Sequence, residues 1–242
     1  MRIAIIGAGN MGATLAAQLT RLGHQVAIAN SRGPRTLAGV AARTGATPVP
    51  IPDVTGNADL VIVAIPEKSI PALPAGLFSA LPEDTVVIDT GNYVPELRDG
   101  HIGAIDAGQP ESQWVQAQLR HPVVKAFNTI RPASLASLGK PAGAAGRTVI
   151  PVAGDDPAAK SVVLELADQL ASTAWTPARS PSPGASSPAP PSTPPTCPST
   201  PPGRPWPTRP RTRPPAGAAS THNTQSRTPP CTQAAAPACA SS

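Results

Sequence analysis

The chain has 242 residues, including 34 prolines, and a formal net charge of +5. Residues 1–171 carry a net charge of −1, whereas residues 172–242 hold six arginines and no acidic residue, for a net charge of +6. Residues 1–171 contain no cysteine, no histidines at metal-ligand spacing and no apolar run near the roughly 18 residues that cross a membrane, which excludes disulfides, a thiolate metal site and a membrane span there.

Strand and helix signals alternate along residues 1–171. Short β-branched or apolar runs predict six buried strands, at 2–6, 26–29, 60–65, 85–89, 122–127 and 147–153. Apolar residues at helical spacing predict helices at 11–22, 34–43, 112–120 and 157–171, a helix from residue 68 that Pro71 and Pro74 interrupt, and an irregular stretch at 90–110. This alternation is typical of the α/β class and predicts a Rossmann-type doubly wound parallel sheet.

Residues 172–242 contain 19 of the prolines, all three cysteines and no Val, Ile, Leu, Met or Phe. Such a segment cannot bury enough apolar surface to offset the entropy of ordering its backbone, about 1–2 kcal/mol per residue. We therefore expect a folded domain over 1–171 and a disordered Pro/Ala/Ser/Arg-rich tail over 172–242. Because the first apolar run stops at Ile6 before a glycine-rich turn, we interpret it as a strand rather than a signal peptide and expect a cytoplasmic protein.

The glycine-rich turn after the first strand is a candidate phosphate site. Gly7-Ala8-Gly9-Asn10-Met11-Gly12 is a G-x-G-x-x-G motif between a predicted strand and a predicted helix. Gly7 permits a tight turn, Gly9 lets the backbone approach a pyrophosphate, and Gly12 lets the helix pack closely on the strand. We predict that these six residues bind a dinucleotide; the alternative is a glycine-rich turn without a ligand.

The end of the second strand indicates which dinucleotide binds. NAD sites place an acidic residue there, about 20 residues beyond the glycine motif, to bind the ribose 2′-OH. Here the strand is followed by Ser31, Arg32 and Arg35, and no acidic residue is present. Ser31 can donate a hydrogen bond, and the two arginines can form charge-assisted hydrogen bonds with a 2′-phosphate. We therefore predict NADP(H); the alternative is that the arginines are ordinary surface charges.

The carboxyl ends of three further strands are candidates for a catalytic cleft, because doubly wound sheets bind ligands at that edge. These ends are residues 64–67, 89–93 and 125–130. Lys125 and Asp89 are candidate acid or base groups, or else Lys125 forms a structural pair and Asp89 orients a loop. No catalytic triad or pair of carboxylates stands out, and hydride transfer between two cofactors needs positioning more than a proton donor.

Four segments together carry a family resemblance: M-R-I-A-I-I-G-A-G-N-M-G, A-N-S-R-G-P, G-N-Y-V-P-E-L-R-D-G and V-V-K-A-F-N-T-I. Over residues 1–170 the chain resembles the NADPH-dependent coenzyme F420 reductase family, whose cofactor fold is shared with pyrroline-5-carboxylate reductase. The resemblance implies hydride transfer between the nicotinamide C4 and C5 of the deazaflavin F420, a small-molecule substrate, and a homodimer. It implies that NADP is held by residues 7–12, Ser31, Arg32 and Arg35, and that the nicotinamide is lined by Ile65, Pro66, Asn92, Phe127 and Asn128.

The chain departs from the family pattern after residue 170. Members continue with a strand, D-A-G-x-L and, in relatives like this one, E-S-W-R-x-Q-P-G-T-P-x-Y. When the third base of each codon from Ala174 to Thr193 is read with the first two bases of the next, permitted codons give V-D-A-G-S-L-A-E-S-W-R-Q-Q-P-G-T-P-V-Y, and all nineteen steps are allowed. We hypothesise that the reading frame slipped near residues 170–172 and that the tail is an out-of-frame product.

A competing interpretation treats the tail as a selected segment, either a proline-rich linker or ligand in polyproline II form or an arginine-bearing nucleic-acid arm. The arginines are sparse and have almost no interleaved aromatics, so we predict no nucleic-acid partner. We assign no role to Cys197, Cys231 and Cys239.

The leading functional hypothesis is an NADPH-dependent oxidoreductase of the F420 reductase type, using F420 or another small acceptor, with activity impaired by loss of the family's C-terminal segment. The alternatives are a non-catalytic NADP(H)-binding sensor or truncated pseudoenzyme, and an NADPH reductase that acts on an imine or a metal complex.

Overall fold

The computed structural model describes residues 1–137, 139–141, 143–170 and 173–175, all within the compact unit Met1–Ala185. Apart from residues 173–175, the tail predicted over 172–242 lies outside the described residues. The predictions of its disorder and of a frame slip concern that part of the chain and stay predictions. No helix in the described part of the chain is long and apolar enough to cross a membrane.

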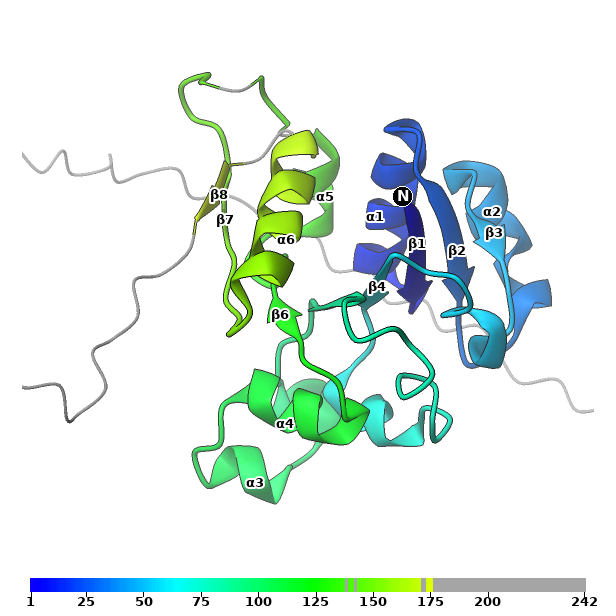
Figure 1. The fold of residues 1–242 in the computed structure, drawn as a ribbon, viewed down its shortest axis with the longest axis vertical. Coiled ribbons are helices and arrows are strands. Elements are labelled where there is room, and N and C mark those ends of the chain that lie inside the picture. The colour runs from blue at the N-terminus through cyan, green and yellow to red at the C-terminus, as the bar shows by residue number, and fades with distance from the viewer. Residues whose placement is uncertain (138, 142, 171–172, 176–242) are drawn as a thin grey trace, which may run out of the picture. The chain divides into compact units, whose positions relative to one another are not determined.

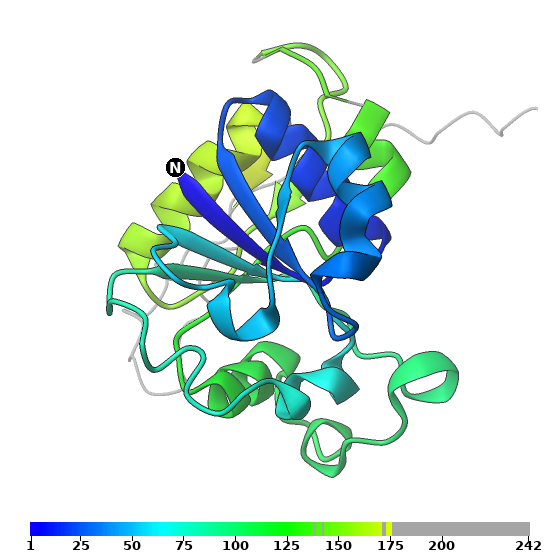
Figure 2. The same ribbon diagram turned by 90° about the vertical axis from the view of Figure 1, so that its right-hand side faces the viewer.

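A six-stranded sheet forms the centre of the fold (Figures 1 and 2), and each strand runs parallel to its neighbours in the order β3-β2-β1-β4-β5-β6. The strands are β1 (Arg2–Ile6), β2 (Gln25–Ala29), β3 (Thr47–Pro48), β4 (Leu60–Val63), β5 (Val86–Asp89) and β6 (Val124–Lys125). The chain winds outward from β1 to β3 and then returns to β4, on the other side of β1. The predicted doubly wound sheet is confirmed, and its switch point lies between β1 and β4, where such sheets bind ligands.

The sixth strand of this sheet is not the predicted one. β7 (Val149–Pro151) pairs instead with β8 (Thr173–Trp175) in a two-stranded parallel sheet, and an isolated antiparallel bridge joins Lys125 to Ala153. The sheet gains its sixth strand from β3 instead, a strand of two residues, one of which is proline. Proline is tolerated there because β3 is an edge strand, but a run this short gives no periodic signal.

Helices and single turns connect the strands. The helices are α1 (Asn10–Arg21), α2 (Ala38–Thr44), α3 (Gly103–Asp106), α4 (Glu111–Leu119), α5 (Pro132–Ser137) and α6 (Pro157–Gln169). The turns are η1 (Pro34–Leu37), η2 (Ile51–Asp53) and η3 (Glu67–Ala72), which are 3₁₀, and η4 (Pro95–Asp99), which is π-helical. No helix was predicted over 132–137 or within 90–110, where α5, η4 and α3 occur.

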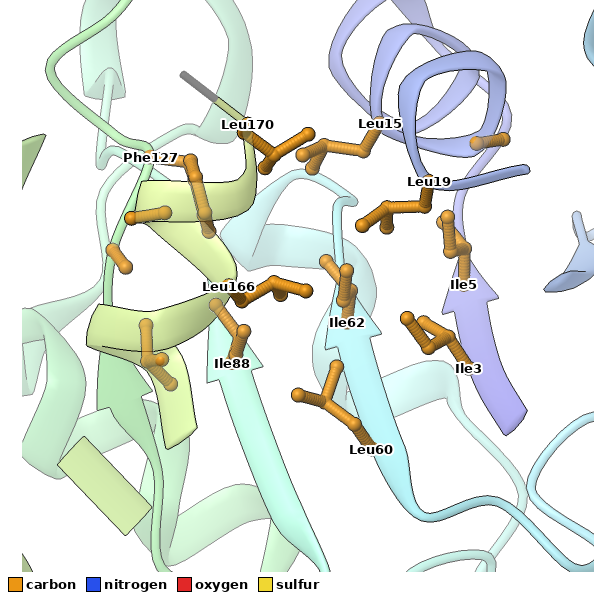
Figure 3. Packing of buried hydrophobic residues seen from close by; sticks show 14 of the residues in the cluster. Ile3, Ile5, Leu15, Leu19, Leu60, Ile62, Ile88, Phe127, Leu166 and Leu170 are labelled. Carbon is orange, nitrogen blue, oxygen red and sulfur yellow. The ribbon is translucent and has the colours of Figure 1, made fainter. Parts of the chain in front are cut away.

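The two faces of the sheet bury separate cores because successive side chains of a strand point to opposite sides. Ile3 and Ile5 of β1 pack with Leu15 of α1 and Leu166 of α6 on one face (Figure 3). Ala4 and Ile6 lie in the core of the other face, which α4 covers with Trp114, Val115 and Leu119. Helices on both faces leave the carboxyl edge of the strands available for a site.

Candidate functional site

The glycine-rich turn links β1 to α1 at the carboxyl edge of the sheet. Gly7 has a φ of +113° and donates its N–H to the Ala29 carbonyl at 2.8 Å. A Cβ on Gly7 would lie 2.3 Å from the Ala64 carbonyl oxygen, and one on Gly12 would lie 1.9 Å from the Gly7 carbonyl oxygen. These two glycines are therefore needed for the turn itself, because no side chain fits at either position.

Gly9 occupies a different environment. A Cβ on this residue would meet no atom within 4 Å, so the space beside it is open. Gly9 is also the N-cap of α1, and no side chain caps that end of the helix. The first N–H groups of an uncapped helix lack partners and attract anions. The turn thus offers open space and hydrogen-bond donors at the place where the motif predicts a pyrophosphate.

One cavity of about 440 Å³ lies between this turn, the end of β2 and η3. It brings together five of the predicted cofactor residues, namely Gly7, Ala8, Gly9, Ser31 and Arg32. Three further lining residues, Ala64, Ile65 and Pro66, belong to the predicted strand end 64–67. The rest were not predicted as site residues, although one of them, Asn30, directly follows the second strand: Ile6, Asn30, Ile51, Ser69, Ala72 and Leu73. Arg35 does not line it.

The loop after β2 is held by Asn30. The Asn30 Oδ1 atom accepts the Arg32 N–H at 3.1 Å, and its Nδ2 donates to the Thr36 Oγ1 at 2.9 Å. The side chains of Ser31, Arg32 and Arg35 are exposed. Neither arginine forms an ion pair with any residue that the structure describes. Arg32 is therefore available to a phosphate at this end of the cavity, and Arg35 on η1 adds a second positive charge outside its lining.

A second cavity of about 510 Å³ adjoins the first and shares Gly9, Ala64, Ile65 and Pro66 with it. It brings together all five residues predicted to line the nicotinamide: Ile65, Pro66, Asn92, Phe127 and Asn128. Asn10 and Met11 also line it. The lining also includes four residues of the predicted strand ends 89–93 and 125–130, namely Thr90, Gly91, Thr129 and Ile130, and three residues that were not predicted, namely Arg98, Arg131 and Pro132.

Two loops are tied together at this second cavity. The Asn92 Nδ2 donates to the Asn128 carbonyl at 2.8 Å, and the Asn128 Nδ2 donates to the Asn92 Oδ1 at 3.2 Å. The neighbouring Phe127 is completely buried and has a φ of +63°, a left-handed conformation that is uncommon for a residue with a bulky side chain. The loops after β5 and β6 therefore hold a defined shape around the cavity.

Lys125 and Asp89 form an ion pair with an Nζ–Oδ2 distance of 2.9 Å, and Lys125 also lies 3.3 Å from Glu111. The other oxygen of Asp89 accepts the Gly91 N–H at 2.8 Å. This geometry agrees with the structural alternative, in which Lys125 is paired and Asp89 orients the loop that contains Gly91. The acid or base role of either residue stays a prediction.

Glu67 is a completely buried acid at the start of η3. Its Oε2 accepts from the Arg98 Nη2 at 2.9 Å, whereas its Oε1 has no hydrogen-bond partner among the described residues. Burial raises the pKa of Glu67 to about 7, against the opposing charge of Lys125. The ion pair between Glu67 and Arg98 was not predicted, because no sequence pattern indicates that Arg98, 31 residues further along the chain, contacts η3.

Arg98 connects Glu67 to the second cavity, which it lines. Its guanidinium lies 2.8 Å from Asp99 and also contacts the Asn92 carbonyl. Burial alone would raise the pKa of Asp99, but the hydrogen bonds from Arg98 and the Val94 N–H outweigh it and the pKa is lowered. Within the described residues, no group of three His, Cys, Asp or Glu side chains is placed to hold a metal ion.

The two cavities fit a molecule made of two linked halves. Arg32 offers a cation at one end, the uncapped start of α1 lies in the middle, and an apolar wall of Ile65 and Pro66 leads to the other end. A dinucleotide has this order of chemistry: a nucleoside at each end and a pyrophosphate between them. The open space at Gly9 leaves room for that pyrophosphate.

The chain is similar to one family of oxidoreductases and to proteins of known structure. Residues 2–93 match the family described as NADP oxidoreductase, coenzyme F420-dependent. A protein of unassigned function from Sinorhizobium meliloti is 30% identical, with a TM-score of 0.61 over 73% of this chain and 84% of that one. A protein provisionally assigned as an F420-dependent NADP reductase, from an Arthrobacter species, is 27% identical, with a TM-score of 0.58 and the same coverage.

A more distant structure shares the fold alone. A pyrroline-5-carboxylate reductase from Coxiella burnetii is 14% identical, with a TM-score of 0.52 over 73% of this chain and 58% of that one. No curated protein matches the chain.

Proposed function

Since the chain belongs to the family of coenzyme F420-dependent NADP oxidoreductases, we propose that it transfers a hydride between NADP(H) and a deazaflavin such as F420, or another small acceptor. The observation that carries the proposal is the pair of adjoining cavities that meet at Gly9. One contains Ser31 and Arg32, and the other gathers residues from the ends of β4, β5 and β6.

The first cavity would hold the adenosine half of NADP(H). Ser31 and Arg32 would bind the 2′-phosphate, Arg32 by charge-assisted hydrogen bonds. Arg35 lies outside the lining and would contribute mainly through its charge. The N–H groups that follow Gly9 would receive the pyrophosphate. Because no carboxylate lies at the end of β2, nothing there repels a 2′-phosphate.

The second cavity would hold the nicotinamide half and the acceptor. The cofactor, when bound, supplies or receives the hydride at its nicotinamide ring. Ile65 and Pro66 would form an apolar wall that keeps water from the ring, and the completely buried Phe127 would anchor the loop after β6 beside it. The paired amides of Asn92 and Asn128 would fix the floor on which the ring and the acceptor are oriented. Positioning of two reactants is the main requirement of such a transfer.

We further propose that the tail is an out-of-frame product and that loss of the family's C-terminal segment impairs turnover. The shifted reading of codons 174–193 is compatible with the motif that members of the family carry, and the observed residues fix two bases of most shifted codons. Resequencing of the locus tests the slip. An insertion or deletion near codons 170–172 supports it, and an intact frame shared with close relatives contradicts it.

A titration combined with an assay tests the function. NADPH and NADH are titrated against the chain as it stands and against the chain with its frame restored, and hydride transfer to F420 is then measured. We expect tighter binding of NADPH than of NADH in both forms and faster turnover in the restored form. Binding of NADPH without turnover in either form would favour the non-catalytic sensor. Equal affinity for NADH would contradict the assignment of Ser31 and Arg32.

A further inference from the structure

Glu67 lies directly behind the second cavity without lining it. Two residues that do line the cavity contact its carboxylate. The Arg98 Nη2 donates to Oε2 at 2.9 Å, and a Cβ on Gly91 would lie 2.3 Å from Oε1. The side chain of Glu67 has no exposed surface. A charge on this carboxylate is therefore separated from the cavity by a single layer of residues and is poorly screened by water.

The surroundings of Glu67 contain more acids than bases. Three other acids belong to this cluster: Asp89 on β5, Asp99 on η4 and Glu111 on α4. Lys125 pairs with Asp89 and Glu111, and Arg98 pairs with Asp99. The third cation, Lys68, donates to the Arg98 carbonyl. With Glu67 ionised, four carboxylates would share three cations. The excess negative charge favours a proton on one member of the cluster.

The Oε1 atom of Glu67, which has no hydrogen-bond partner in the described part of the chain, is where such a proton would reside. The Cβ position on Gly91 that lies 2.3 Å from Oε1 is also 3.1 Å from the Asp89 Oδ1, so both oxygens border the same small space. A buried carboxylate oxygen without a donor is costly, whereas a protonated Oε1 is itself a donor facing that space. The raised pKa of Glu67, about 7, agrees with this geometry and permits both states near neutral pH.

We propose that Glu67 couples a proton to the redox state of the bound cofactor, so that NADP⁺ binds better when Glu67 is ionised and NADPH binds equally well to both forms. This inference rests on the proposed function, which places the nicotinamide in the second cavity. The oxidised ring carries a positive charge and the reduced ring does not. A negative carboxylate behind Gly91 and Arg98 therefore attracts only the oxidised ring, and binding of NADP⁺ expels the proton from Oε1.

The experiment compares dissociation constants of NADP⁺ and NADPH for the full chain at pH 6 and pH 8. If the ionised form of Glu67 binds NADP⁺ about tenfold more tightly than the protonated form, and Glu67 titrates near pH 7, the NADP⁺ affinity should rise about fivefold relative to that of NADPH between pH 6 and pH 8. The 2′-phosphate, which titrates near pH 6, is common to both cofactors and cancels in the ratio. In E67Q the ratio should not change with pH. E96Q is the matched control, since Glu96 is 79% exposed on the same turn as Arg98, and it should keep the wild-type dependence.

A second measurement needs no variant. Calorimetric titrations at pH 7 in two buffers of different ionisation enthalpy count the protons released on binding. NADP⁺ should release a fraction of a proton more than NADPH does. Binding of both cofactors with a constant ratio and equal proton release would overturn this inference alone, as would a pH dependence that persists in E67Q. Failure of both cofactors to bind would overturn the proposed function and this inference with it.

Discussion

Gly12 lies so close to Gly7 that a Cβ on residue 12 would stand 1.9 Å from the Gly7 carbonyl oxygen. Gly9, between them, faces open space. The G-x-G-x-x-G motif thus contains two glycines that the turn requires and one that only a ligand would require. The fold and the binding site place separate demands on neighbouring residues, and substitutions can test them separately.

Gly12→Ala should destabilise the fold. The added methyl group overlaps a backbone atom, so α1 or the turn must shift, and we expect the free energy of unfolding to fall by about 3 kcal/mol. Urea denaturation measures this change. The matched control is Gly39→Ala in α2, where the new Cβ would meet only a flexible arginine atom, Arg43 Nη1, at 3.6 Å. Alanine favours a helix, so this control should be as stable as the wild type or more so. Equal stability of both variants would contradict the overlap.

Gly9→Ala should leave the stability nearly unchanged and weaken cofactor binding. The new methyl group enters the space through which a pyrophosphate would approach the start of α1, so we expect NADPH affinity to fall about tenfold or more. Fluorescence titration with NADPH gives the affinity, and urea denaturation gives the stability. Unchanged affinity in a stable variant would show that no phosphate group approaches the turn at Gly9.

The sequence predicted this turn well because its signal is local. A β-branched run, three glycines and a helical repeat lie within 21 residues, and the structure places β1, the turn and α1 there. β3 was missed for the opposite reason. Its two residues join the sheet through pairing of Ala27 with Thr47 and Ile28 with Pro48, which depends on where α2 ends rather than on any pattern in β3 itself.

Arg32→Ala should reduce NADPH affinity more than Arg35→Ala does. Arg32 lines the first cavity and Arg35 does not, so only Arg32 is placed for direct contact with a 2′-phosphate. Loss of one charge-assisted hydrogen bond should weaken NADPH binding by about tenfold. NADH lacks the 2′-phosphate, so its affinity should not change in either variant, and parallel titrations measure both cofactors. An equal loss for NADH would mean that Arg32 does not recognise the phosphate.

The candidate site was predictable where its residues directly follow strands. Asn92, Phe127 and Asn128 follow β5 and β6, and the parallel sheet brings their loops to the same edge. Arg98 and Glu67 were not predictable in this way. Their contact depends on the π-helical turn η4 folding back over η3, and both residues lie in segments without periodic hydrophobicity. Long-range contacts of irregular segments leave no spacing that a single sequence displays.

Glu67 should make the fold less stable as the pH rises from about 4.5 to about 7. Burial raises its pKa from the ordinary value of 4.5 to about 7, so within this window the folded chain holds a proton that the unfolded chain has released. Stability is therefore highest below the window and falls through it, by about 3 kcal/mol in total, and remains lower above pH 7. Glu67→Gln cannot ionise, so its stability relative to the wild type should increase over the same range. Urea denaturation at pH 5, 6.5 and 8 measures the difference.

Asp59→Asn is the control, because the Arg2 hydrogen bond lowers the pKa of Asp59 to about 2, and the contribution of Asp59 to stability is lost only as the pH falls below about 4. A constant difference between Glu67→Gln and the wild type at all three pH values would mean that Glu67 is ionised throughout, even though its Oε1 lacks a hydrogen-bond donor among the described residues.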